Sequence, residues 1–191
     1  MSQSSSELVP DKISPKRDND GRRQRLREFQ AQLVDRMQAA RSGVDTRVNQ
    51  LGVMIGQTRW LLNLKEAGEI VSVGSITKVP LTHGWFLGLA NIRGNLISVV
   101  DFAQFQGHPP AAIEKDSRII AFAPALSFNS GLLVSRVMGL RNIAEMEAQA
   151  PVDATTTPWC TQRYVDSESN VWNELDISLV VQDPQFLQVG L

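Results

Sequence analysis

Residues 88–102 read Gly-Leu-Ala-Asn-Ile-Arg-Gly-Asn-Leu-Ile-Ser-Val-Val-Asp-Phe, and this stretch is the most specific local pattern in the sequence. Asn91 and Gly94 are turn residues, because Asn bonds its own backbone and Gly accepts a positive φ at little cost. They place Arg93 at the exposed tip of the turn, and a buried apolar strand follows and ends at Asp101. The stretch therefore predicts a tight turn that presents an arginine at the end of a rigid strand.

Arg93 allows two interpretations. Its guanidinium fork, held by the turn, is pre-positioned to bind a carboxylate on a partner protein. The alternative is an ion pair within the domain, with Asp101 or Glu69 as the acceptor. Gly94 is predicted to be required for its backbone conformation rather than for a contact.

Short apolar segments flank this stretch on both sides, and turn residues separate them. They predict strands near residues 53–55, 60–64, 70–73, 96–100, 118–123, 132–137 and 175–181, with one helical turn near 101–106. No segment between them is long enough for crossover helices, so the pattern favours antiparallel barrels or a sandwich over a doubly wound sheet. Two strand clusters, roughly 51–101 and 117–181, have similar lengths, and we expect two small barrels side by side.

The N-terminal region has a different character. Residues 1–21 are rich in Ser, Pro, Asp, Asn and Gly and predict a disordered tail. Residues 22–43 predict an amphipathic helix of about five turns. Its apolar residues recur at steps of three and four: Leu26, Phe29, Leu33, Met37 and Ala40. Residues 44–191 then form the folded domain.

Composition limits the class of protein. The 191 residues carry a net charge of −1, which divides into +3 over residues 1–50 and −4 over residues 51–191. A mildly acidic domain argues against a nucleic-acid-binding core. Cys160 is the single cysteine, so no internal disulfide can form, and a small buried hydrophobe is its expected role. No apolar run reaches the roughly 18 residues of a membrane span and no secretory signal is present, so we expect a cytoplasmic protein.

Catalytic motifs are absent from the sequence. It contains no phosphate loop, no H-E-x-x-H and no G-x-S-x-G, and we expect no enzyme activity, no cofactor and no metal. His83 and His108 lie in loops and are too few to identify a metal site. Trp85 follows Gly84 in a loop and is the candidate for a partly exposed binding anchor. The other tryptophans are expected in the core: Trp60, Trp159 and Trp172.

The quoted stretch resembles the signature of CheW-like adaptor domains, which runs through Asn, an aliphatic residue and Arg-Gly into an apolar strand that ends in Asp. Other segments resemble the family in the same order: 53–64, 66–70, Val79-Pro80, 118–122 and 131–137. The resemblance covers about residues 48–190. Ser98, Phe102 and Ser135 depart from the usual Pro, Leu and Asp, and Ala67 is smaller than the usual Val.

The resemblance implies an all-β fold of two five-stranded SH3-like barrels without catalytic activity. It implies two partners, the cytoplasmic tip of a methyl-accepting chemoreceptor and a CheA-type histidine kinase, and contact with the membrane only through receptor arrays. Within the family, the sequence is most similar to adaptors of chemosensory systems that control type IV pili and twitching motility. Matching the family residue by residue implies partner-binding positions at Ala67, Glu69, Asn91, Arg93, Gly94 and Asp101.

One alternative stays open at this stage. A small β-barrel that binds single-stranded nucleic acid would use the N-terminal arginines as an electrostatic arm. The acidic domain, the single tyrosine and the lack of a stripe of aromatic and basic residues argue against it.

Overall fold

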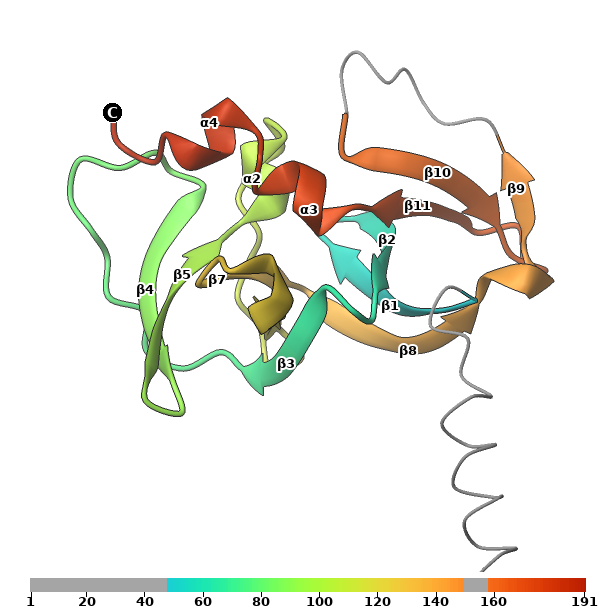
Figure 1. The fold of residues 1–191 in the computed structure, drawn as a ribbon, viewed down its shortest axis with the longest axis horizontal. Helices are drawn as coiled ribbons and strands as arrows, with labels where there is room; N and C mark the ends of the chain where they lie inside the picture. Colours follow the sequence, from blue (N-terminus) through green and yellow to red (C-terminus); the bar gives the residue numbers. More distant parts are fainter. Residues whose placement is uncertain (1–47, 150–157) are drawn as a thin grey trace, which may run out of the picture. The chain divides into compact units, whose positions relative to one another are not determined.

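Short strands are the main secondary structure of the computed structural model, which describes residues 48–149 and 158–191 (Figure 1). The predicted tail and N-terminal helix lie outside these residues. The strands are β1 (Asn49–Ile55), β2 (Thr58–Asn63), β3 (Ala67–Ser72), β4 (Phe86–Ile92), β5 (Asn95–Val100), β6 (Arg118–Phe122), β7 (Ser130–Val134), β8 (Arg136–Asn142), β9 (Glu147–Gln149), β10 (Cys160–Val165) and β11 (Val171–Leu175). The helical turns are α2 (Phe102–Phe105), η1 (Pro124–Leu126), η2 (Ile143–Glu145), α3 (Ile177–Val180) and α4 (Pro184–Leu187).

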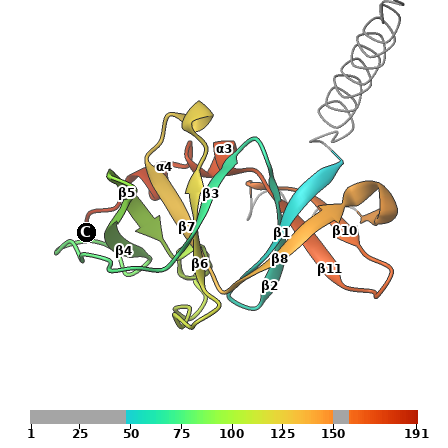
Figure 2. The ribbon, with the colours of Figure 1, turned by 90° about the horizontal axis from the view of Figure 1, so that it is seen from below.

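The strands form two sheets, and each sheet curls into a small barrel. Barrel A has the strand order β8-β1-β2-β11-β10-β9, and the turn η2 joins its two outer strands, β8 and β9. Barrel B has the order β3-β6-β7-β5-β4. Figure 2 shows them side by side, with β4, β5 and β7 in one and β1, β2 and β11 in the other. The prediction of an all-β fold with two barrels is confirmed, although barrel A has six strands instead of the expected five.

A close backbone approach closes barrel B. Thr77, which follows β3, exchanges backbone hydrogen bonds of 2.8 and 2.9 Å with Leu89 of β4. Gly88 lies beside this pair, and a Cβ there would lie 2.1 Å from the Thr77 carbonyl oxygen. The first glycine of the quoted stretch is therefore required because a side chain would prevent closure.

The expected division of the chain between the barrels is wrong. Barrel B takes residues 67–134 without interruption, whereas barrel A takes its strands from residues 49–63 and 136–175. The two parts of barrel A meet where β2 pairs in parallel with β11, Trp60 opposite Asn173 and Leu62 opposite Leu175. This pairing spans more than a hundred residues of sequence, and local apolar periodicity carries no information about it.

The predicted strand at 175–181 is also wrong beyond its first residue. Asp176 accepts a hydrogen bond from the Leu179 amide (3.0 Å) and caps α3. Ile177 and Val180 are buried at helical spacing, and Leu179 is 39% exposed. The alternation of apolar and polar residues was thus compatible with a strand and with a helix, and the Asp176 cap stabilises the helix. The predicted helical turn at 101–106 is confirmed as α2.

The main hydrophobic core lies at the junction of the barrels and contains residues from both. Barrel A contributes Leu51, Val53, Ile55 and Leu62; barrel B contributes Ile120, Phe122, Leu132 and Val134. A smaller core fills barrel B, around Ile97, Val99, Ile119 and Leu133. Since each fully buried side chain of this size contributes about 1.5–3 kcal/mol, the junction holds the barrels in a defined arrangement.

Three tryptophans and the cysteine occupy the interior, as predicted. Trp60, Trp159 and Trp172 are at most 7% exposed, and Cys160 is 6% exposed. Burial raises the pKa of the Cys160 thiol, which keeps it protonated and unreactive at neutral pH.

Candidate partner-binding surface

The turn between β4 and β5 has the predicted geometry. Ile92 pairs with Asn95, so Arg93 and Gly94 form a two-residue hairpin loop. Both have a positive φ, +49° and +90° respectively, as a type I′ turn requires. The Asn91 side-chain oxygen accepts a 2.8 Å hydrogen bond from the Gly94 amide. A Cβ at Gly94 would contact nothing within 4 Å, so this glycine is required for its backbone conformation.

Arg93 forms an ion pair inside the domain while remaining at the surface. Its Nε lies 2.6 Å from Oε1 of Glu69 on β3, and the two side chains are 80% and 33% exposed. The pair links the hairpin tip to the other outer strand of barrel B. Glu69 is therefore the acceptor, not Asp101, and most of the guanidinium surface stays available to a partner.

Asp101 differs from the expectation of a partner-binding residue. It is 1% exposed, and its carboxylate accepts hydrogen bonds from the Gln104 amide (3.1 Å) and the Ala111 amide (2.7 Å). The side chain thus caps α2 and holds the loop that leads to β6. This role is structural, because burial removes the carboxylate from any partner's reach.

Trp85 is half-buried and belongs to a cluster of aromatic rings. Its ring stacks on Phe186 of α4 and on His83, each at 5.8 Å between centroids. It meets Phe105 edge-on at 5.1 Å. The predicted binding anchor is therefore mostly engaged inside the protein.

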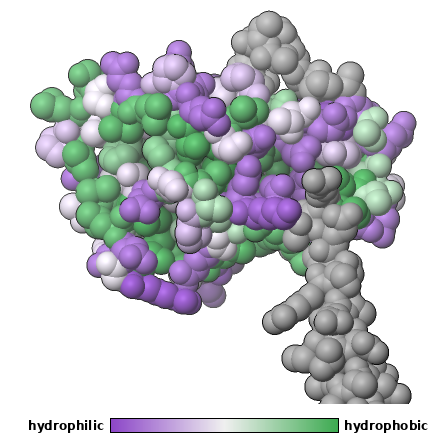
Figure 3. Space-filling view, in the orientation of Figure 1, coloured by the Kyte–Doolittle hydropathy of each residue, from purple (hydrophilic) through white to green (hydrophobic). Residues whose placement is uncertain are grey.

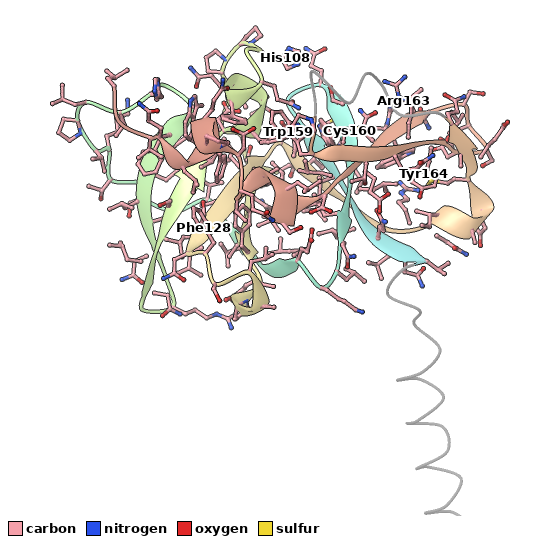
Figure 4. All side chains as sticks on the ribbon, turned by 45° about the horizontal axis from the view of Figure 1, so that its top comes forward. His108, Phe128, Trp159, Cys160, Arg163 and Tyr164 are labelled. Carbon is pink, nitrogen blue, oxygen red and sulfur yellow. The ribbon has the colours of Figure 1, made fainter. Side chains whose placement is uncertain are left out.

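An apolar groove lies beside these rings, on the outer face of barrel B. It has a volume of about 270 Å³, and its lining comes from β4, β5, the segment before β7, and α4: Phe86, Ser98, Val100, Phe128, Ser130, Phe186, Leu187 and Val189. Figure 3 shows hydrophobic residues gathered on this face where β5, β7 and α4 lie, and Figure 4 labels Phe128 there.

A series of neighbouring residues links Ala67 to this groove. It pairs with Phe122 across β3 and β6, Phe122 meets Phe128 at 6.4 Å, and Phe128 meets Phe186 at 6.0 Å. Ala67 itself is half-buried and packs against the junction core. The structure thus connects Ala67 with the groove, and Glu69 with the Arg93 turn, along one strand, β3.

A larger cleft of about 590 Å³ lies between the β1–β2 turn and the loop before β6, and it includes His108, Glu114 and Ser117. The Ser117 hydroxyl accepts a hydrogen bond from the Glu114 amide (2.9 Å), so this hydroxyl is engaged internally. We place the candidate surface at the smaller groove, because its lining is mainly apolar and includes three aromatic rings.

Comparison with known proteins shows the family. Residues 50–185 match the CheW-like domain, which is most of the chain. The chain belongs to the CheW-like family. A CheW-like protein is a scaffold of chemosensory signalling, and this match favours the adaptor interpretation over the nucleic-acid alternative.

Two CheW-like relatives support the assignment. The chain is 26% identical over 139 residues to Protein PilI of Pseudomonas aeruginosa. The aligned region covers 71% of this chain and 75% of that protein. It is also similar to the crystal structure of the scaffolding protein TtCheW from Thermoanaerobacter tengcongensis, with a TM-score of 0.58 and 25% identity. That match covers 68% of this chain and 84% of the other.

Sequence reasoning missed several residues of this CheW-like surface. Phe128 and Phe186 line the groove, although both lie outside the signature. The signal for Phe186 was present: Asp183-Pro184 is a helix start, and the first apolar residue after it faces inward. Phe128 carried no such signal, because it stands in a loop whose path depends on the tertiary fold.

Glu66 is the other missed residue. It lies in the crossing from β2 to β3, and its carboxylate accepts a 3.0 Å hydrogen bond from the Ile177 amide at the start of α3. Burial raises the pKa of Glu66, and the nearby carboxylates of Asp176 and Glu174 raise it further, against the hydrogen bonds that lower it. Glu66 therefore connects two segments that cross between the barrels, the β2–β3 connection and the start of α3.

Two observations concern other kinds of site. Within residues 48–149 and 158–191, no three His, Cys, Asp or Glu side chains gather closely enough to hold a metal ion. None of the helices in these ranges is long and apolar enough to cross a membrane.

Proposed function

We propose that this CheW-like protein couples a methyl-accepting chemoreceptor to a CheA-type histidine kinase. The receptor's cytoplasmic helical tip docks in the apolar groove of barrel B, and the kinase binds elsewhere on the barrels. The protein itself catalyses no reaction. The signal passes as a shift between arrangements of the bound proteins.

The groove is the observation that carries this proposal. An amphipathic helix binds by placing apolar side chains at helical spacing into a hydrophobic groove. The half-buried rings of Phe86 and Phe128 and the exposed Leu187 can contact such side chains, and the small side chains of Ser98 and Ser130 leave room between them. Arg93, 80% exposed in its side chain, adds a cation that a carboxylate on the receptor helix can pair with.

The proposal extends to the pathway. The similarity to Protein PilI, together with the signature residues, supports a chemosensory system that controls type IV pili and twitching motility. In such a cell the protein lies in receptor arrays on the cytoplasmic side and reaches the membrane only through the receptor.

The decisive experiment blocks the groove. Ser98→Trp places an indole in a groove of about 270 Å³. We expect the tagged variant, purified from its own cells, to keep a histidine kinase and to lose the chemoreceptor at least tenfold relative to wild type. Thr161→Trp is the matched control, since Thr161 is an exposed strand residue of barrel A. Full receptor recovery with Ser98→Trp would place the receptor elsewhere.

The pathway is tested separately. Deleting the coding sequence should abolish surface twitching and leave flagellar swimming intact. The opposite pattern would assign the adaptor to a flagellar system and leave the docking proposal standing.

A further inference from the structure

Residues 183–191, the strap, attach to barrel B through one buried side chain and a short stretch of backbone pairing. Asp183 caps α4 by accepting a 2.8 Å hydrogen bond from the Gln185 amide. Phe186 is the one buried residue of this four-residue helix, at 2% exposure. Two other apolar residues of the strap, Leu187 and Leu191, are 53% and 82% exposed, and Val189 between them is half-buried.

Phe186 enters an aromatic box formed by Trp85, Phe105 and Phe128. Its ring lies 5.8 Å from Trp85 in a stacked arrangement, 5.5 Å from Phe105 edge-on, and 6.0 Å from Phe128. Offset-stacked and edge-to-face pairs at these distances are favourable beyond the area they bury. The three rings of the box thus contact a single aromatic side chain, that of Phe186, in different orientations.

The residues after Phe186 pair with barrel B as a short added strand. The His83 amide donates to the Val189 carbonyl (2.9 Å), and the Leu191 amide donates to the Leu81 carbonyl (3.0 Å). Gly190 forms a β-bridge with Thr82 between these bonds. A buried anchor followed by main-chain pairing to an existing segment is how many domains bind linear peptides.

We propose that the aromatic box and residues 81–83 form a peptide-binding site and that the strap occupies it in cis as a releasable ligand. The ligand class is a short segment with an aromatic anchor followed by an extended stretch. Neither sheet includes residues 183–191, so both barrels close without the strap. Segments with few buried side chains open locally while the core stays folded.

Release of the strap has a consequence for the groove. Phe186, Leu187 and Val189 line it together with Phe86 and Phe128 of barrel B. When the strap leaves, the groove loses this wall and the box opens, so receptor docking and strap docking are coupled. This consequence rests on the proposed function, whereas the peptide site does not.

The test supplies the strap in trans. Full-length Phe186→Ala leaves the box empty, and a synthetic peptide of residues 183–191 is titrated into it and followed by tryptophan fluorescence and melting temperature. We expect saturable binding that restores part of the lost melting temperature. A peptide with Ala at 186 should bind at least tenfold more weakly, a difference of about 1.4 kcal/mol. Wild-type protein, whose box is filled, should bind the natural peptide at least tenfold more weakly than the variant.

Gln185→Ala is the matched control, because it alters an exposed side chain on the same helix that lines neither the box nor the groove, and it should behave as wild type. If Phe186→Ala does not fold, Phe186→Leu is used in the same titration. Hydrogen exchange of the wild-type protein gives a second reading: the amides of His83 and Leu191 should exchange together and faster than those of β6. The proposal would be overturned if these amides exchanged only on global unfolding. It would also be overturned if the two peptides bound equally well. Neither outcome depends on whether the receptor binds the groove.

Discussion

Gly94 shows how a single residue sets the shape of the signature turn. Its φ of +90° is a conformation that residues with a Cβ resist, and no neighbouring atom lies within 4 Å of a Cβ built there. We expect Gly94→Ala to destabilise the domain by about 1 kcal/mol or more through backbone strain. Denaturant unfolding measures the change. Gly74→Ala is the matched control, since Gly74 also has open space around it and its φ lies outside the left-handed region; equal effects would refute the strain account.

Arg93 combines an internal ion pair with an exposed charge. The pair with Glu69 is largely solvated, so Arg93→Ala should lower the free energy of unfolding by at most about 1 kcal/mol. Its affinity for receptor or kinase should fall tenfold or more, about 1.4 kcal/mol, measured by calorimetry. Glu69→Gln breaks the same pair but keeps the guanidinium. An equal loss of affinity in both variants would show that the pair orients the turn and that the cation is not itself the contact.

At the scale of elements, α3 depends on a carboxylate from another part of the chain. The folded pKa of Glu66 is raised above 4.5 by burial, with Asp176 and Glu174 adding to it. A raised pKa means that this group's contribution to stability is fully present below the unfolded pKa and is lost as the pH rises through the folded pKa.

Glu66→Gln should therefore become more stable relative to wild type as the pH rises from about 4 to 7. The neutral amide oxygen still accepts the Ile177 hydrogen bond, and the repulsion from Asp176 is absent. Melting temperatures of both proteins across this range measure the difference. A difference that is constant with pH would show that Glu66 titrates normally in the fold.

Elements also show where sequence patterns succeed. Strand β5 and the α2 turn were predictable, because they depend on apolar spacing and on a cap within a few residues. Strand β4, which precedes the signature turn, was not predicted. Helix α3 was not, since the run from Leu175 to Val181 satisfies both periodicities. The groove escaped prediction because its rings come from β4, the loop before β7 and α4, which only the fold brings together.

At the scale of the whole molecule, the two barrels depend on strands that all lie between residues 49 and 175. We expect a protein lacking residues 1–43 to keep its β circular dichroism and to unfold cooperatively. The loss of stability should be no more than a few kcal/mol, the contribution of a handful of apolar side chains. Loss of the β spectrum would show that the N-terminal region is part of the core.

The sequence by itself determined the hairpin turn, the class of fold and the family, because glycine conformation, apolar spacing and a contiguous signature are local properties. It also determined that Trp60, Trp159 and Trp172 are interior residues. Only the tertiary structure decided that barrel B is inserted into barrel A, that Glu69 and not Asp101 meets Arg93, and that Asp101 is buried. Only the tertiary structure brought Phe186 to Trp85, 101 positions earlier in the chain. Each of these depends on contacts between segments far apart in sequence, whose pairing is chosen by the packing of the whole domain and not by the residues on either side.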